Sequence, residues 1–155
     1  MLLSVHATVG AVLGEQVSTP LLAFVLGFIS HFILDIIPHG DEALIKAYRN
    51  DFKNKGMKYL IVFDLVSTAI LLPLLFYTQK ISFNPVVLWG IIGGVLPDFM
   101  VGINEVTHKH FKRMNKLHFW AHGKLGKTFG KNLSWTMPLK LGLLGQIILL
   151  YLILR

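Results

Sequence analysis

Four long apolar segments are the feature that most constrains the fold of this chain. They cover residues 19–37, 57–77, 85–103 and 136–154. A helix needs about 20 mainly apolar residues to cross the roughly 30 Å hydrocarbon core of a bilayer. Only 15% of the residues are charged, whereas soluble domains carry about 25%. The sequence therefore predicts an all-α integral membrane protein in which residues 1–155 form a single helical bundle with four spanning helices.

Shorter segments accompany the four predicted spans. Residues 2–14 are apolar but short, so we expect a short N-terminal helix that packs against the others. Residues 41–56 and 108–131 are rich in Lys and predict amphipathic segments on the cytoplasmic side. Such segments lie in the headgroup layer, where lysines attract anionic lipid. We expect the lipid bilayer and its anionic headgroups as partners, and no nucleic acid because no folded recognition module is evident.

The basic residues are distributed unevenly along the chain. Thirteen of the 15 Lys and Arg residues lie in 42–58 and 104–140, and the connections 15–18 and 78–84 carry almost none. Loops rich in Lys and Arg stay on the cytoplasmic side of a membrane. The distribution therefore predicts a multi-pass protein of the cytoplasmic (inner) membrane, with its basic loops inside.

Acidic residues and histidines collect in one layer near the predicted cytoplasmic ends of the apolar segments. This layer contains His6, His31, Asp35, Asp64 and Asp98. At 1.5 Å per helical residue, all five lie within about 11 Å of the predicted boundary. A charge in hydrocarbon costs about 2.5–3.5 kcal/mol. These groups must therefore neutralise one another, bind a cation or line a wet cavity.

The stretch GFISHFILDIIPHGDE gives the local geometry of a metal site. His31 and Asp35 are four residues apart and share one helix face. Pro38 turns the chain after them and brings His39 back over the helix end. The chain has no cysteine, and imidazole and carboxylate ligands suit zinc, with manganese or iron as alternatives. We therefore predict a divalent metal centre with the ligands His6, His31, Asp35 and Asp98.

Other side chains are candidates for the same site. Asp41 follows His39, and His118 and His122 repeat the four-residue spacing in LHFWAH, so these are additional candidate ligands. Asp64 and His39 are candidates for a catalytic base or an orienting group. The same pattern also fits hydrogen bonds between histidine and aspartate that hold helices together without any metal.

Three segments carry a resemblance to a bacterial family. GFISHFILDIIPH (27–39), GGVLPDFM (93–100) and VHATVGAVLG (5–14) resemble the S-H-x-x-x-D, L-P-D and H-x-x-x-G segments of the membrane-bound metal-dependent hydrolase-like proteins. These relatives are described as LexA-regulated inner-membrane hydrolases. The pattern is also distantly similar to the ligand helix of zinc-dependent phospholipase C. The resemblance implies a helical membrane protein with a metal site.

Two functions stay open at this point. One is a metal-dependent hydrolase that acts at the inner leaflet on a phospholipid or lipid-linked phosphate, because the predicted site lies at headgroup depth. The other is a non-enzymatic metal-binding or structural membrane module. An ion permease is disfavoured, because a permeation path needs polar residues through both leaflets, and the outer halves of the predicted spans contain no Asp, Glu or His.

Overall fold

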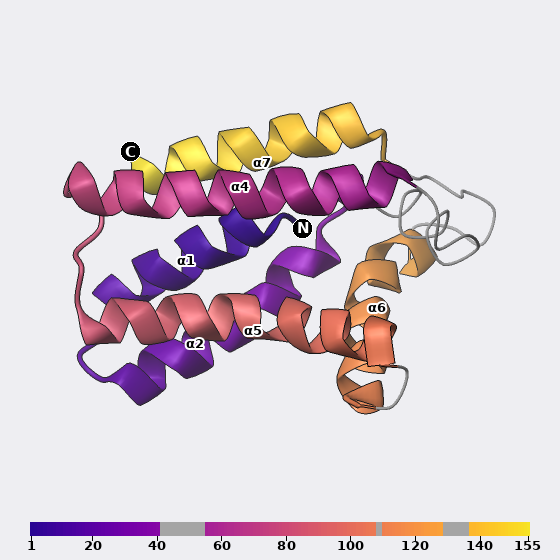
Figure 1. Cartoon of the computed structure of the whole chain (residues 1–155), viewed down its shortest axis with the longest axis horizontal. Coiled ribbons are helices and arrows are strands. Elements are labelled where there is room, and N and C mark those ends of the chain that lie inside the picture. Colours follow the sequence, from indigo (N-terminus) through magenta and orange to yellow (C-terminus); the bar gives the residue numbers. More distant parts are fainter. Residues whose placement is uncertain (41–54, 108–109, 129–136) are drawn as a thin grey trace.

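The regular structure of the described residues is entirely helical. A computed structural model describes residues 1–40, 55–107, 110–128 and 137–155, and within these ranges it contains helices and no strand. The helices are α1 (Leu3–Glu15), α2 (Pro20–Ile36), α4 (Lys55–Tyr77), α5 (Pro85–Thr107), α6 (Lys112–Thr128) and α7 (Leu139–Leu154) (Figure 1). The predicted all-α class is confirmed. The predicted amphipathic segment over 41–56 lies almost wholly outside the described residues, and Asp41 lies outside them too.

Two of the described helices, not four, are long and apolar enough to cross a membrane. These are α4 and α5, with 23 residues each, or about 34 Å at 1.5 Å per residue. Helices α2 and α7 have 17 and 16 residues, or about 25 Å each. Two prolines limit α2: Pro20 lies in its first turn, and Pro38 favours the extended conformation observed at Ile37. The prediction of four full-length spans was therefore too high.

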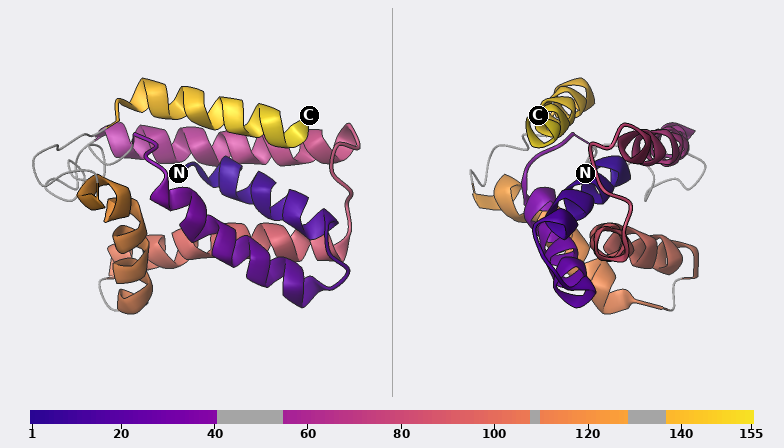
Figure 2. Two further views of the ribbon diagram at one scale, coloured as in Figure 1. Left: turned by 180° about the vertical axis from the view of Figure 1, so that it is seen from behind. Right: turned by 90° about the vertical axis from the view of Figure 1, so that its left-hand side faces the viewer.

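Helix α5 packs closely against both α1 and α2 (Figures 1 and 2). Glycines make this close approach sterically feasible. A Cβ atom at Gly90 would overlap the backbone oxygen of Gly10, and a Cβ atom at Gly27 would overlap the backbone oxygen of Gly90. Small residues four apart permit helices to approach in this way. The contact carries α1 and α2 onto the face of α5 that bears the site.

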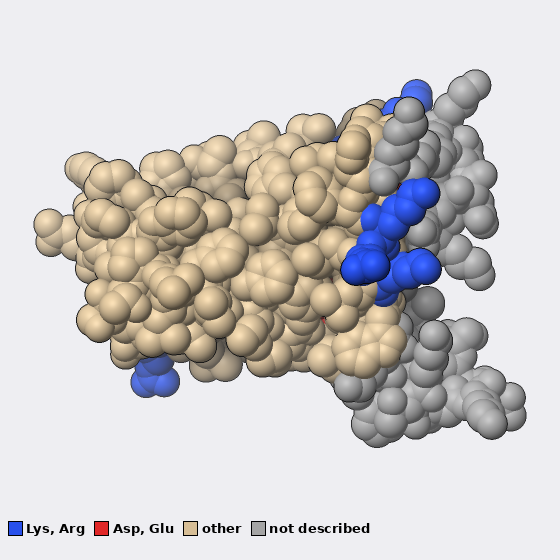
Figure 3. All heavy atoms as spheres, turned by 90° about the horizontal axis from the view of Figure 1, so that it is seen from below, with Lys and Arg blue, Asp and Glu red and all other residues tan. Residues whose placement is uncertain are grey.

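The outer faces of the apolar helices are exposed. Leu21 on α2, Ile70 on α4 and Ile147 on α7 have 75%, 63% and 63% of their surface accessible. Exposed apolar surface of this extent is unusual on soluble monomers and marks contact with lipid or another apolar partner. In Figure 3 the Lys and Arg side chains on the visible face gather mainly at one end of the bundle.

That end of the bundle also carries the ionisable residues. It contains the N-terminal end of α1, the C-terminal ends of α2 and α5, and helix α6, which packs across α2 and α5 (Figure 1). Lys55 and Lys58 lie in the first turn of α4, and Lys112 and Lys116 lie in α6. Basic side chains and the site described next therefore share one end of the molecule.

Candidate metal centre

Seven ionisable side chains converge where α1, α2, α5 and α6 meet. They form three overlapping groups whose ligand atoms lie within 4.8 Å of one another: His6, His31 and Asp98; His31, Asp35 and His118; and Asp35, His39 and His122. Five of the seven are buried: His6, His31, Asp35, His39 and His118. The four residues predicted as ligands are thus brought together, and these buried groups could hold a metal ion.

Helical spacing places most of these side chains. His31 Nε2 lies 3.1 Å from Asp35 Oδ2 on α2, and the Nε2 atoms of His118 and His122 on α6 are 2.9 Å apart. Residues four apart lie one above the other on a helix face. Each helix therefore presents a pair of polar side chains to the same point, as the sequence predicted.

Backbone carbonyl groups determine which nitrogen of two histidines faces the centre. His31 Nδ1 lies 2.8 Å from the carbonyl oxygen of Gly94, and His39 Nδ1 lies 2.7 Å from that of Ile37. A carbonyl oxygen only accepts hydrogen bonds, so each Nδ1 carries the hydrogen and donates it. In the neutral form of each ring, the Nε2 lone pair then points into the cluster. Metal-bound histidines are oriented by this kind of hydrogen bond.

Three atoms in the second group have the spacing of ligands around one ion. His31 Nε2 lies 3.1 Å from Asp35 Oδ2 and 3.3 Å from His118 Nδ1, and these last two atoms are 3.6 Å apart. Ligands about 2.0–2.2 Å from a tetrahedral zinc ion are separated from each other by about 3.3–3.6 Å. Two sides of the triangle lie in this range and the third, 3.1 Å, is slightly shorter, so the three atoms approximate one face of a coordination tetrahedron.

The two carboxylate oxygens of Asp35 have different neighbours. Its Oδ2 atom has imidazole nitrogens of His31, His118 and His122 within 3.6 Å, but none of the described residues gives it a well-directed hydrogen bond. Its Oδ1 atom accepts a 2.7 Å hydrogen bond from the α-amino group of Met1. In neutral His31 the Nε2 lone pair faces the negatively charged Oδ2 atom, and the two repel each other. The short distance between Nε2 and Oδ2 is favourable only if the ring carries a second proton or if a cation binds both atoms.

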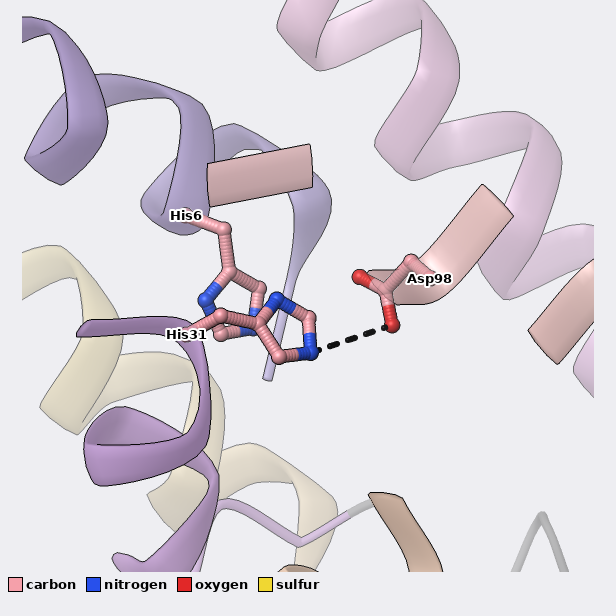
Figure 4. Close-up of side chains that lie close together, drawn as sticks. All are labelled: His6, His31 and Asp98. Atoms are coloured by element: carbon pink, nitrogen blue, oxygen red, sulfur yellow. Dashed lines mark ion pairs between the residues drawn. The ribbon is translucent and has the colours of Figure 1, made fainter. Parts of the chain in front are cut away.

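The first group extends this arrangement toward α5. His6 stacks on His31 with ring centroids 3.9 Å apart, and its Nε2 atom lies 3.2 Å from Asp35 Oδ1. Asp98 faces both rings in Figure 4, with Oδ1 3.7 Å from His31 Nε2. The side chain of Asp98 is 28% exposed, whereas that of His31 is fully buried.

The third group lies on the other side of Asp35. His122 Nε2 is 3.2 Å from Asp35 Oδ2, and the rings of His39 and His122 have centroids 4.8 Å apart. The α-amino group of Met1 lies 2.6 Å from His39 Nε2 and forms an ion pair with Asp35. A positively charged group therefore already lies between His39 and Asp35.

The charge state of His118 suits metal binding. Burial, followed by the neighbouring His122, lowers the pKa of His118 from 6.5 to about 2. Both effects disfavour the imidazolium form, burial because it removes hydration from a charge. The ring is therefore neutral at pH 7 and keeps a lone pair for a ligand.

Asp64, predicted as a candidate catalytic base, lies elsewhere. Its carboxylate accepts hydrogen bonds from the backbone N–H groups of Leu3 and Ser4 and from the Ser4 hydroxyl. The first N–H groups of a helix have no partner within the helix, so Asp64 satisfies the N-terminus of α1. It belongs to none of the three clustered groups. The catalytic roles given to Asp64 and His39 remain predictions.

Sequence reasoning missed two elements of this site. The Gly94 carbonyl oxygen, which orients His31, has no signal in the sequence because every residue carries a carbonyl group. The Met1 α-amino group also enters the cluster, because α1 runs with its first turn against the end of α2. Only the tertiary packing of α1 could have indicated this.

Comparisons of the chain with protein families, with curated proteins and with solved structures gave no match.

Proposed function

We propose that this protein is a metal-dependent hydrolase of the cytoplasmic membrane that acts on a phospholipid or lipid-linked phosphate at the inner leaflet. The observation that carries the proposal is the triangle of His31 Nε2, Asp35 Oδ2 and His118 Nδ1, with sides of 3.1, 3.3 and 3.6 Å. Three protein ligands with a fourth position left open are typical of catalytic zinc sites. Zinc is the proposed ion, with manganese or iron as alternatives.

The proposed membrane location depends on the apolar helices. Helices α4 and α5 are long enough to cross a bilayer, and α2 and α7 are shorter apolar helices beside them. In this proposal a locally thinned bilayer accommodates the shorter pair. The basic residues at the site end then face the cytoplasm, in keeping with the excess of Lys and Arg in cytoplasmic loops.

The proposed substrate class follows from the charges around the site. Lys55, Lys58, Lys112 and Lys116 lie at the same end of the bundle as the cluster. Lysines near a membrane surface attract anionic headgroups, and phosphate is the anionic group that phospholipids share. Asp98 is partly exposed, and we expect the phosphate to enter beside it.

Each residue has a distinct part in the proposed reaction. A divalent ion held by His31, Asp35 and His118 would polarise the phosphoryl group and make water a better nucleophile at neutral pH. Asp98, the more exposed of the two clustered carboxylates, would accept the proton of the attacking water. His39 would orient its neighbours through its hydrogen bond to Ile37.

The test measures phosphate or headgroup release from a panel of phospholipids by detergent-purified protein loaded with zinc. We expect release by the wild type and its loss in His31→Ala and Asp35→Ala, with helix content unchanged by circular dichroism. His110→Asn is the matched control, because His110 is exposed and belongs to none of the clustered groups. Turnover that survives both site substitutions would contradict the proposal.

One observation favours the non-enzymatic alternative. His6, His31 and Asp35 have at most 1% of their surface exposed, and structural metal sites are closed to solvent. A metal-binding module that joins α1, α2, α5 and α6 would need no substrate access. Stoichiometric metal without turnover on any lipid of the panel would support this alternative.

A further inference from the structure

A second set of ligand atoms lies beside the triangle and shares one residue with it. His122 Nε2 lies 3.2 Å from Asp35 Oδ2, and His39 completes a group whose atoms lie within 4.8 Å of one another. His31 and His118 take no part in this group. The two groups therefore have separate histidines and a common carboxylate.

The shared residue decides whether both groups can be filled at once. His31 cannot serve two ions, because its Nδ1 donates to Gly94 and only one lone pair remains on the ring. A carboxylate has two oxygens and about four lone-pair positions. Asp35 can therefore bind an ion on each side, whereas the two groups that share His31 exclude each other.

We propose that the centre holds two divalent cations bridged by Asp35. The first ion is bound by His31, Asp35 and His118, and the second by Asp35, His39 and His122. Pairs of ions about 3.5–4 Å apart occur in many enzymes that cleave phosphate esters, where they stabilise both the attacking and the leaving oxygens. This inference rests on the metal centre of the proposed function, and it does not depend on hydrolysis.

The α-amino group of Met1 lies at the second position in the structure. It lies 2.7 Å from Asp35 Oδ1 and 2.6 Å from His39 Nε2, between a carboxylate and an imidazole whose Nδ1 is already committed to Ile37. A divalent ion in the second position displaces this ammonium group. If the ammonium group is retained instead, only one ion binds.

The experiment counts the metal ions bound per molecule of the purified protein. Protein freed of metal with a chelator is dialysed against excess Mn²⁺ and passed through a desalting column. The bound manganese is then measured by inductively coupled plasma mass spectrometry. We expect two ions per chain in the wild type and in the control His110→Asn, one in His39→Asn and in His122→Asn, and at most a trace in Asp35→Asn. The electron paramagnetic resonance spectrum of the wild type should show a spin-coupled manganese pair.

Other ion counts would contradict the bridged pair, the proposed hydrolase or both. One ion per chain in the wild type, with the spectrum of an isolated Mn²⁺, overturns the bridged pair but leaves a single-ion hydrolase standing. Two ions that persist in both His39→Asn and His122→Asn place the second ion elsewhere and also overturn it. No bound ion contradicts the proposed function as well, and two ions without turnover overturn the hydrolase alone. His39→Asn and His122→Asn are read separately, so a folding failure in one leaves the other decisive.

Discussion

Two carboxylates near the N-terminal end of α1, Asp64 and Asp35, have opposite surroundings. Asp64 accepts hydrogen bonds from two backbone N–H groups and one hydroxyl. Asp35 Oδ2 is surrounded by imidazole nitrogens, and the neutral form of His31 turns a lone pair toward it, because its Nδ1 donates to Gly94. Asp64 is fully accounted for by the fold. In Asp35 only Oδ1 is, through its ion pair with the Met1 ammonium group, whereas Oδ2 needs a cation or an additional proton among its neighbours.

Asp64 and Asp35 look alike in a hydropathy plot, but one has a structural role and the other belongs to a candidate binding site. Both are acids within apolar helices, and burying either without a partner costs free energy. Donors supplied by the chain make a carboxylate structural, because every hydrogen-bond requirement is met within the fold. Ring nitrogens that converge on one carboxylate oxygen make a candidate binding site, because a metal ion can join their lone pairs to the negative charge.

The largest expected effect is that of Asp35→Asn on metal affinity. The amide has nearly the same shape but no charge, and it keeps only one oxygen, a weaker ligand than a carboxylate. Loss of hydrogen-bond partners around a metal already costs about 10–100-fold in affinity, so loss of this ligand should cost more than about 100-fold. A competition titration with a coloured chelator measures it, and an affinity within threefold of the wild type would contradict the assigned role of Asp35.

Asp64→Ala tests the other half of the comparison. It removes the acceptor of the first N–H groups of α1, and leaving buried donors unsatisfied costs about 1–3 kcal/mol each. We expect a lower midpoint of thermal unfolding in detergent, with metal affinity within about threefold of the wild type. If Asp64→Ala instead abolished metal binding and left the unfolding midpoint unchanged, the assignments of the two carboxylates would have to be exchanged.

The smallest expected effect is the pH dependence of stability in the metal-free protein. The folded state keeps His118 neutral because its pKa is lowered to about 2, whereas the unfolded chain takes up a proton below its ordinary pKa of 6.5. The unfolded state then binds more protons as the pH falls, so stability decreases between pH 7.5 and 5.5 by about 1 kcal/mol from this residue. Thermal unfolding at both pH values measures it, and His118→Asn should show the smaller decrease. An equal decrease in the two proteins would assign the effect to other histidines.

Most of the site prediction followed from the separation of polar residues along the sequence. The four-residue separations in α2 and α6 place His31 with Asp35 and His118 with His122 by helical geometry alone. His6 and Asp98 were predicted by a different argument, the cost of isolated charges in hydrocarbon, and both join the cluster. Asp64 was predicted by that same argument but lies outside the cluster. The cost of burying a charge shows that a carboxylate needs a partner, but it does not show whether the partner is a metal ligand or a backbone N–H group.

The fold class could be predicted from hydropathy, but the number of full-length spans could not. An apolar window includes residues such as Ile37 that lie outside the helix, because the proline that follows favours an extended conformation there. The orientation of the histidine rings depends on carbonyl groups of other helices. Such contacts exist only after the helices pack.

The most direct test of the central claim, that converging acceptors at Asp35 are held together by a cation, is X-ray absorption spectroscopy of zinc bound to the purified protein. We predict a first shell of nitrogen and oxygen ligands at about 2.0–2.2 Å, with the outer-shell scattering of at least two imidazole rings. The signal should be lost in Asp35→Asn and retained in Asp64→Ala. A zinc spectrum without imidazole scattering, or a protein that binds no zinc, would contradict the account.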